Sequence, residues 1–336
     1  MNKGQSGSRQ QETEVFCGIE VSQRELLVDC GGRQRGFANT AAGRRSLLQW
    51  LKNGGGVVRA CLEATGQYGL DAALELDAAG VQLMVVNPRA VRHFAQALLR
   101  RSKTDPLDAA VLREFAARME FRRWRRPSRE ELALVGMARR MQSLAEMITA
   151  EKNRLHAACL STALPKIVRQ QIERSIATME RSQKKLLEAA QQEIGADAGL
   201  ARKYAQLQSV RGLGARSALA LLAELLLLGE QCGARQWVAH AGLDPREYRS
   251  GQSVQKQVRI SRAGNGRLRR ALYMPALVAA HHDPHLGEFY RRLLSRGKSK
   301  MTALVAVMRK MLHAIYGMFR HGQDYEGSKL FASAAA

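Results

Sequence analysis

Four carboxylates are the residues of this sequence whose types and positions best suit chemistry. Glu20 and Glu63 each interrupt an apolar stretch, VFCGIEVS and VVRACLEAT, and Asp105 and Asp108 stand three residues apart in KTDPLDA. An acid inside an apolar strand costs free energy unless it is paired or binds a metal, and i, i+3 spacing puts two side chains on one helix face. Carboxylate oxygens are the ligands that Mg²⁺ prefers, and two such ions about 3.5 to 4 Å apart assist attack on a phosphodiester. If the four acids converge, they predict a divalent-metal site for phosphoryl transfer.

Each acid also has a simpler structural interpretation when it is taken alone. Asp105 precedes Pro106 and could cap the helix that begins there, because Asp before Pro is a common helix start. Asp108 could be a solvated helix residue and Glu63 an acid on an edge strand, while Asp29 on the second strand competes for a metal role. The prediction therefore depends on the fold bringing the four acids together.

A serine surrounded by cations is a second candidate for chemistry. Ser250 stands in RSG, within a segment from residue 242 to residue 270 that is rich in turn residues and arginines. Guanidinium groups bind phosphate oxygens bidentately and would stabilise the charge that develops when a hydroxyl attacks a phosphodiester. From composition alone Ser250 is more simply a turn residue, and Ser253 and Ser261 are rivals.

Basic residues cluster beside both candidates. A charge run is usually a solvated face, but cations next to carboxylates would offset the repulsion between those acids and a nucleic acid. The candidate nucleic-acid-binding residues are Arg101, Lys103, Arg122, Arg123, Arg125 and Arg126 near the paired aspartates, and Arg249, Arg259, Arg262, Arg267, Arg269 and Arg270 near Ser250.

The composition supports a polyanionic partner. The chain has 336 residues, with 53 Lys and Arg against 30 Asp and Glu, which gives a net charge of +23. With 46% apolar residues the chain can bury a core, so we do not expect a disordered protein. Only 5% of the residues are aromatic, which argues against recognition of nucleic acid mainly through stacking. Charge would have to do that binding.

Cysteine usage and hydropathy predict the compartment. The five cysteines have no CxxC spacing, which argues against a disulfide framework and a structural zinc site and suits a reducing cytoplasm. No stretch of about 18 apolar residues occurs, and residues 1–14 are polar. We expect a soluble protein of the cytoplasm with no membrane partner.

The hydrophobic pattern divides the chain into an α/β part and an all-α part. The N-terminal order β-β-β-α-β-α-β-α is typical of the helix-covered sheet of RNase H-like nucleases. Two long amphipathic helices follow, which usually form a packing or oligomerisation hairpin and could instead clamp nucleic acid. In residues 207–228, Gly212 and Gly214 separate two apolar segments, which suits a helix-hairpin-helix and equally an ordinary turn between helices. The predicted strands are residues 15–22, 25–30, 36–40, 57–65 and 81–86, and the predicted helices are 42–52, 68–79, 91–118 with an interruption at 103–107, 130–158, 167–194 and 301–319.

Four segments of the sequence resemble the motifs of insertion-sequence-110 family transposases and the related Piv-type DNA invertases. They are CGIEVSQ, CLEATGQYG, NPRAVRHFAQALLRRSKTDPLDAAVLREFA and GLDPREYRSGQSVQKQVRISRAGNGRLRRALYMPAL, and the resemblance covers about residues 16–325. It implies a RuvC-like N-terminal domain, a long helical coiled-coil region and a helical C-terminal transposase domain that carries a serine. The implied divisions are a flexible leader at 1–14, the RuvC-like DEDD domain at 15–127, the coiled-coil linker at 128–203, the serine transposase domain at 204–325 and a tail at 326–336.

The resemblance also implies an activity. Glu20, Glu63, Asp105 and Asp108 match the DEDD tetrad that would bind Mg²⁺, and Ser250 matches the serine that attacks DNA. The implied function is a transposase of an insertion sequence that cleaves and exchanges DNA strands at sites chosen by a structured bridge RNA. The implied partners are double-stranded donor and target DNA, that guide RNA, and further copies of the chain in a homodimer or homotetramer, in association with the nucleoid of a prokaryotic cell.

One tetrad position departs from the family motif and keeps two other interpretations open. The family normally has Asp where this sequence has Glu20, whose carboxylate reaches about one methylene further. A site that needs placement to about 0.5 Å could be weakened by that change. The alternatives are a Piv-type site-specific invertase with the same residues and a catalytically weakened nucleic-acid-binding scaffold.

Overall fold

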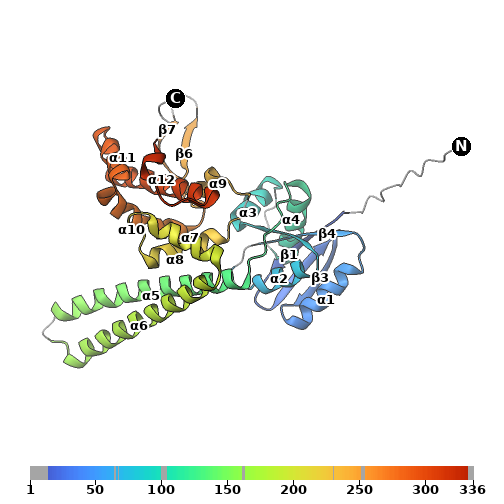
Figure 1. The fold of residues 1–336 in the computed structure, drawn as a ribbon. Coiled ribbons are helices and arrows are strands. Elements are labelled where there is room, and N and C mark those ends of the chain that lie inside the picture. Colours follow the sequence, from blue (N-terminus) through green and yellow to red (C-terminus); the bar gives the residue numbers. More distant parts are fainter. Residues whose placement is uncertain are drawn as a thin grey trace. The chain divides into compact units, whose positions relative to one another are not determined.

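The computed structural model consists of two compact units, Met1–Arg126 and Pro127–Ala336 (Figure 1). It describes residues 14–331 apart from 64, 65, 67, 100–103, 161, 162, 230 and 251–253. Arg101 and Lys103, two of the predicted nucleic-acid contacts, therefore lie outside the described residues. Each unit has its own hydrophobic core.

The first unit is built on a mixed five-stranded sheet with the order β3-β2-β1-β4-β5. β1, β2 and β3 are antiparallel neighbours, whereas β4 and β5 continue the sheet in parallel with β1. The strands are β1 (Glu14–Val21), β2 (Glu25–Cys30), β3 (Arg33–Ala38), β4 (Val57–Glu63) and β5 (Gln82–Val86), and the helices are α1 (Ala41–Lys52), α2 (Leu70–Ala78), α3 (Pro88–Ala97) and α4 (Asp105–Arg118). This order of elements confirms the α/β prediction for the N-terminal part.

Two helices pack on each face of the sheet, and the strand residues that contact them alternate along β1 and β4. On one face, Ile19 of β1 and Leu62 of β4 pack in a core with residues of α1 and α2. On the other face, Phe16 and Cys61 pack with residues of α3 and α4. Successive residues of a strand point to opposite faces, so the two glutamates at positions 20 and 63 belong to the face that carries α4.

Helix α4 lies directly on β1 at Gly18. A Cβ atom at this glycine would stand 1.9 Å from the carbonyl oxygen of Ala109 and 2.4 Å from the backbone nitrogen of Arg113. Both neighbours are backbone atoms of a helix, which cannot swing away as a long side chain can. Only glycine therefore allows the helix to approach the strand this closely.

Asp29 of β2, the acid that competes for a metal role, has a structural function. The residue is 3% exposed, and its side chain forms an ion pair with Arg113 Nε of α4 at 2.9 Å. Asp29 also accepts hydrogen bonds from the backbone N–H of Gly32 and the side chain of Gln34, both at 3.1 Å. Gln34 in turn donates to the carbonyl oxygen of Pro106 at 2.9 Å, so β2 and β3 both fasten the start of α4 to the sheet.

A disulfide joins the first two strands. The antiparallel register places Cys17 opposite Cys30 with their Cα atoms 4.1 Å apart, and their sulfur atoms are bonded. The expectation that the cysteines form no disulfide is wrong for this pair. The two residues are 13 positions apart in the sequence, and only the pairing of β1 with β2 makes them neighbours. The other three cysteines are free thiols.

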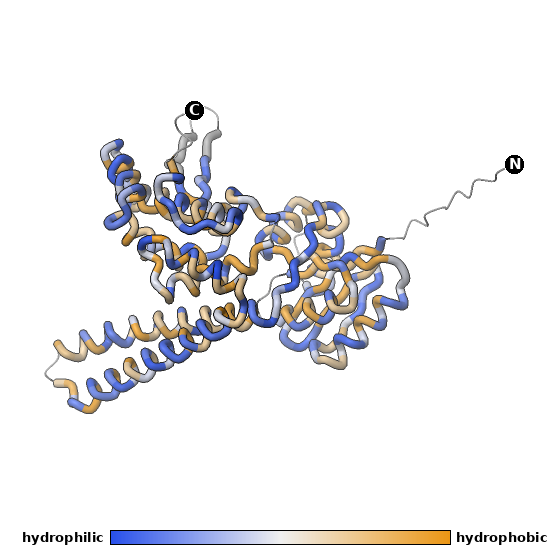
Figure 2. Tube along the Cα trace, in the orientation of Figure 1, coloured by the Kyte–Doolittle hydropathy of each residue, from blue (hydrophilic) through white to orange (hydrophobic). Residues whose placement is uncertain are grey.

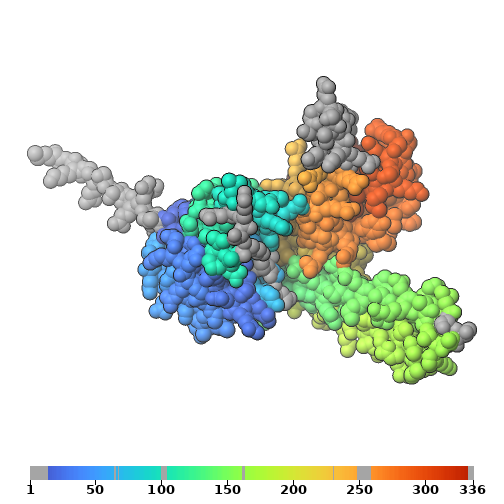
Figure 3. Space-filling view, turned by 180° about the vertical axis from the view of Figure 1, so that it is seen from behind, coloured from blue at the N-terminus to red at the C-terminus, as the bar shows by residue number. Residues whose placement is uncertain are grey.

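Two long helices form an antiparallel hairpin in the second unit, and Figure 3 shows it projecting from the other helices of that unit. Hydrophobic and hydrophilic residues alternate along both helices (Figure 2). Ile148 packs with Ile172 and Ile176 in a small cluster, whereas Leu134 and Ala190 join the main core of the unit. The helices are α5 (Arg129–Leu160) and α6 (Lys166–Ala196), which confirms the two predicted long helices. None of the described helices is both long and apolar enough to cross a lipid bilayer.

The rest of the second unit is a helical bundle. Its helices are α7 (Ala198–Ser209), α8 (Ala215–Leu226), α9 (Ala234–His240), α10 (Gly266–His282), α11 (Pro284–Ser295), α12 (Lys300–His321) and the 3₁₀ helix η1 (Gly327–Leu330). Between α7 and α8, Gly212 has a φ of 97°, and a Cβ there would stand 2.6 Å from the carbonyl oxygen of Pro275. This glycine therefore serves a turn that packs tightly against α10.

A two-stranded hairpin departs from the prediction of an all-helical C-terminal domain. β6 (Pro245–Ser250) and β7 (Val254–Ile260) pair antiparallel between α9 and α10. Their sequences, PREYRS and VQKQVRI, contain few apolar residues, so period-2 alternation gives little signal. The hairpin carries the candidate serine.

The contact at Gly18 generates a stability prediction. Replacing Gly18 with Ala should lower the free energy of unfolding by about 3 kcal/mol, the upper part of the range for overpacking, because the added methyl meets helix backbone. Urea denaturation followed by circular dichroism measures the change. Gly136→Ala is the matched control, since that glycine lies within α5 with open space around its Cβ position and alanine is the better helix former. Equal stability of the wild type and Gly18→Ala would show that α4 does not dock on β1 in this way.

Candidate active site

Glu20 and Glu63 stand near the carboxyl ends of neighbouring parallel strands. The register pairs Ile19 of β1 with Leu62 of β4, and each glutamate is the next residue on its strand. Adjacent strands lie about 4.8 Å apart, so the two glutamates are neighbours on the sheet. Both side chains are half-buried. The structure thus places two of the four predicted acids side by side.

Asp105 and Asp108 occupy the first turn of α4, where negative charge interacts favourably with the helix dipole. Thr104 is the N-cap residue, so the interpretation of Asp105 as the helix cap is wrong. Asp105 is exposed, and Asp108 is half-buried next to Ala109, whose carbonyl oxygen lies over Gly18. The docking of α4 therefore brings the start of the helix to the sheet face on which the two glutamates lie.

The donor set suits a hard divalent cation, because it consists of carboxylates with no thiol or imidazole. Among the residues that the structure describes, however, no three His, Cys, Asp or Glu side chains are close enough together to ligate one ion. The fold therefore places the two glutamates and the helix that carries the two aspartates on one face of the sheet, but it does not bring three of these acids together at one point.

The predicted cations that follow α4 lie in an irregular segment tied to β5. The backbone N–H of Trp124 donates to the carbonyl oxygen of Leu83 at 2.6 Å. Arg122 forms an exposed ion pair with Glu120 at 2.8 Å, an interaction worth at most about 1 kcal/mol that a phosphate can displace. Of the predicted contacts here, Arg122, Arg123 and Arg126 are exposed and Arg125 is half-buried.

In the second unit, Ser250 is the last residue of β6. It pairs with Val254 of β7 and follows Arg249 in the strand. Its rival Ser253 lies outside the described residues. The other rival, Ser261, donates its hydroxyl to an aspartate oxygen, Oδ1 of Asp244, at 2.6 Å, which is a structural role. Ser250 therefore stands at the far end of a two-stranded ribbon.

The base of this hairpin is fastened to the end of α9. The backbone N–H groups of Arg262 and Asn265 donate to the carbonyl oxygens of Gly242 and His240, at 3.1 and 2.7 Å. Between them, a Cβ at Gly264 would stand 2.2 Å from the same His240 oxygen. The glycine-rich turn of the sequence is thus a close backbone contact that holds the returning strand.

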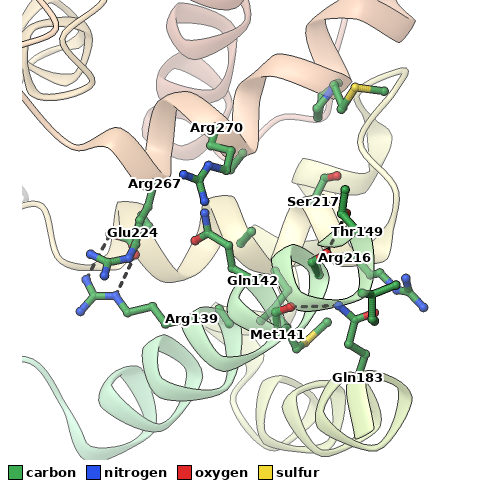
Figure 4. Close-up of a pocket in the computed structure, with 18 of the residues that line it drawn as sticks. Arg139, Met141, Gln142, Thr149, Gln183, Arg216, Ser217, Glu224, Arg267 and Arg270 are labelled. Carbon is green, nitrogen blue, oxygen red and sulfur yellow. Dashed lines mark hydrogen bonds and ion pairs between the residues drawn. The ribbon is translucent and has the colours of Figure 1, made fainter. Parts of the chain in front are cut away.

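Five of the six predicted cations of the second unit fall into three groups, and the side chain of the sixth, Arg249, lies outside the part that the structure describes. Arg269 donates to the C-cap carbonyl oxygen of α9 at 2.8 Å, so its guanidinium holds the base of the hairpin. Arg259 and Arg262 line a pocket of about 570 Å³ beside the start of α12. Arg267 and Arg270 line a groove of about 510 Å³ formed by α5, α6, α8 and α10 (Figure 4). The last two groups are exposed and suited to phosphate.

Glu224 of α8 is a buried acid that the sequence reasoning missed. The residue is 3% exposed, and its carboxylate accepts hydrogen bonds from Arg139 at 3.0 and 3.3 Å and from Asn265 Nδ2 at 2.7 Å. Burial raises the pKa of Glu224, but these hydrogen bonds and the charges of Arg139 and Arg267 outweigh burial and hold the pKa below its usual value. The signal was present in the sequence, because Glu224 interrupts the apolar run LALLAELLLL as Glu20 and Glu63 interrupt theirs.

Two family models match this chain over both units. The DEDD-type model, described as Transposase, matches residues 12–165, and the model described as Transposase IS116/IS110/IS902 family matches residues 204–291. The chain belongs to the IS110 family of transposases. In this IS110-family member the four acids lie within the first match and Ser250 lies within the second.

Relatives of the IS110-family chain include inverting proteins and insertion-element proteins. The pilin gene-inverting proteins of Moraxella bovis and Moraxella lacunata are 26% identical to it over 294 and 297 residues, which is 86% of this chain and 89% of each relative. The insertion element IS110 uncharacterized 43.6 kDa protein of Streptomyces coelicolor is 32% identical over 123 residues, 36% of this chain and 29% of that protein. The resemblance inferred from the four motifs is confirmed.

The environment of Glu224 generates a pH prediction. The charged or titratable groups that face it are Arg139 of α5, Arg267 of α10 and His240 of α9. Because the folded-state pKa lies below the unfolded value of about 4.3, the stabilisation by this carboxylate is fully present above that pH and is lost as the pH falls through the folded pKa. Glu224→Gln should lose about 1 to 3 kcal/mol of unfolding free energy at pH 7 and progressively less as the pH falls toward 3.

Urea denaturation at several pH values tests this dependence. The control is Glu146→Gln, because Glu146 forms an exposed ion pair with Arg270 that contributes little. A stability difference between the wild type and Glu224→Gln that stays constant from pH 7 to pH 3 would contradict a depressed pKa.

Proposed function

We propose that this chain is a site-specific DNA recombinase in which Ser250 attacks the DNA backbone and Glu20, Glu63, Asp105 and Asp108 hold Mg²⁺. The observation that carries the proposal is the face of the first unit's sheet. There the carboxyl ends of β1 and β4 and the first turn of α4 supply acids from three elements of an RNase H-like, RuvC-like arrangement. The match of the DEDD-type transposase model to this part of the chain supports it.

In this proposal the four acids bind a metal ion close to the DNA backbone. Mg²⁺, when bound, would supply positive charge to the phosphate that is attacked. Without a cation, carboxylates on one face repel both each other and DNA, so the surrounding arginines and the net charge of +23 have to bring the substrate in. The longer reach of Glu20 is accommodated if its half-buried side chain bends back toward Glu63.

Ser250 is proposed as the nucleophile. Its hydroxyl oxygen forms a bond to phosphorus while the bond from phosphorus to the deoxyribose oxygen breaks, and the serine proton leaves as the displaced oxygen takes one up. The position suits this role, because Ser250 is the last residue of β6 and the base of the hairpin is hydrogen-bonded to the end of α9. The arginines of the hairpin and of α10 would stabilise the developing charge.

The proposed partners follow from the family and the charge. We propose double-stranded donor and target DNA as substrates, a structured bridge RNA as the guide, and a homodimer or homotetramer as the active form, acting in the nucleoid. In the proposed domain organisation, residues 15–127 carry the acids, residues 128–203 form the helical linker and residues 204–325 carry the serine.

The proposal of a guide RNA predicts that RNA co-purifies with the chain. Sequencing that RNA should give one structured species; purification with no defined RNA would contradict a guide.

A second candidate function is site-specific DNA inversion. It is favoured by the relatives named pilin gene-inverting protein, which match most of this chain. The same acids and serine would act, and only the arrangement of the two DNA sites would differ. The third candidate, a catalytically weakened nucleic-acid-binding scaffold, rests on Glu20 alone.

The serine assignment predicts a covalent intermediate. The wild type, incubated with substrate DNA and its guide RNA, should form a protein–DNA species that survives denaturing gel electrophoresis, and Ser250→Ala should abolish it. Ser253→Ala is the matched control, since it removes a neighbouring hydroxyl and should leave the adduct in place. An adduct that persists in Ser250→Ala would refute the assignment.

The carboxylate assignment predicts the effect of changes at Glu20. Glu20→Ala should reduce strand exchange at least about 100-fold, because loss of one ligand misplaces the metal, whereas Glu20→Asp should retain or raise activity. Glu120→Gln, which removes an exposed acid of the same unit, should leave the rate unchanged. If neither the wild type nor Glu20→Asp exchanges strands with guide RNA and Mg²⁺ present, the scaffold interpretation gains and the enzyme proposal fails.

A further inference from the structure

A buried carboxylate connects the serine hairpin to the long helical hairpin. Glu224 Oε1 accepts a hydrogen bond from Arg139 Nε of α5 at 3.0 Å, and Glu224 Oε2 accepts from Arg139 Nη2 at 3.3 Å and from Asn265 Nδ2 at 2.7 Å. Figure 4 shows Arg139 and Glu224 facing each other at one end of the groove. Three segments that are distant in the sequence therefore meet at one side chain.

Asn265 is the point at which the hairpin returns to the bundle. Its Oδ1 accepts from the backbone N–H groups of Arg267 and Leu268 at 2.9 and 3.1 Å, which caps α10. Its own backbone N–H donates to the carbonyl oxygen of His240 at the end of α9. The other polar group of its side chain, the Nδ2 amide, donates to Glu224 Oε2. The carboxylate thus fixes the rotation of a residue that joins α9, α10 and the returning strand.

The neighbouring contacts make this junction rigid. Ser261 donates two hydrogen bonds to Asp244. Its hydroxyl donates to Oδ1 at 2.6 Å, and its backbone N–H donates to the carbonyl oxygen at 2.9 Å. These two residues mark where the ribbon leaves the bundle and where it comes back. A shift of Asn265 would therefore reach the ribbon through a short, hydrogen-bonded path.

The charge of Glu224 makes the junction costly to break. The acid is 3% exposed, and its partners Arg139 and Asn265 account for both carboxylate oxygens. Removing one partner of a buried pair leaves a charge without compensation. A glutamine at position 224 has the same shape as the glutamate, but without the charge its hydrogen bonds to Arg139 and Asn265 are weaker.

We propose that Glu224 is a positioning residue for the reaction, which sets the location of the Ser250 hairpin through Asn265 and couples it to α5 through Arg139. The proposal rests on the proposed role of Ser250. It connects the base of the α5–α6 hairpin, through Asn265, to the base of the ribbon that carries the nucleophile, so that movement of the long helices changes the placement of the serine. A nucleophile displaced by about 1 Å can lose about 100-fold in rate.

Two single variants and their combination test the proposal. Glu224→Gln removes the charge. Asn265→Asp keeps the acceptor that caps α10 but sets a second carboxylate against Glu224. In the double variant E224Q/N265D, the glutamine amide can donate to the aspartate, so the hydrogen bond is restored with reversed direction and the total charge is that of the wild type.

Adduct formation and DNA affinity are measured for each variant, below its unfolding temperature. We expect each single variant to form the Ser250–DNA adduct at least about tenfold more slowly, with DNA affinity within about twofold of the wild type, and the double variant to recover most of the rate. The matched control is Gln183→Met. Gln183 is equally buried in the same groove, but it donates to the carbonyl oxygen of Met141 at 2.9 Å and joins only α6 to α5. It should lose stability and keep the rate.

Three results would overturn the proposal: unchanged rates in both single variants, a double variant no faster than the singles, or a Gln183→Met variant as slow as Glu224→Gln. Hydrogen–deuterium exchange of residues 244–261 separates this outcome from a failure of the serine assignment. If the wild type forms no adduct, faster exchange there in the singles, reversed in the double variant, still supports the positioning role. Unchanged exchange refutes it.

Discussion

Helix α4 touches β1 at Gly18 with no side chain between them, and the metal site proposed for the first unit depends on that contact. A methyl group at this position would collide with the backbone at Ala109 and Arg113. The contact determines how close the first turn of α4, with Asp105 and Asp108, comes to the sheet face that carries Glu20 and Glu63. The ion pair between Asp29 and Arg113 then prevents the helix from sliding. The proposed metal site requires this close approach, which a glycine at position 18 permits.

In the second unit, close backbone contacts at glycine also hold the hairpin that carries the serine. The hairpin is held by backbone contacts at Gly242 and Gly264 and by one buried acid, Glu224, that is paired with an arginine of another helix. Asp29 and Glu224 are each 3% exposed and fully engaged by protein groups, whereas the side chains of Glu20, Glu63 and Asp108 are half-buried. The two acids that hold the fold are thus more deeply buried than the acids that we propose as metal ligands.

Most of the first unit could be predicted from the sequence, because its strands and helices have strong periodicity and clear boundaries at glycine and proline. The same reasoning placed Glu20 and Glu63 on neighbouring strands. Prediction from the sequence failed for features that leave no periodic pattern of apolar residues. β6 and β7 are strands with few apolar residues, and the Cys17–Cys30 pair depends on the register of two strands. Glu224 was missed because the sequence pattern is the same for an acid that binds a ligand and for an acid in a buried ion pair. Only the partners of the side chain in the folded structure show which role it has.

The central claim is that carboxylates of β1, β4 and α4 bind a divalent cation on one face of the sheet. Anomalous X-ray diffraction from crystals of the full chain soaked in Mn²⁺ tests it most directly. The predicted result is an anomalous peak within coordination distance, about 2.0 to 2.3 Å, of carboxylate oxygens of Glu20, Glu63 and at least one of Asp105 and Asp108. Mn²⁺ bound elsewhere, or no peak at these residues with the site open to solvent, would contradict the account.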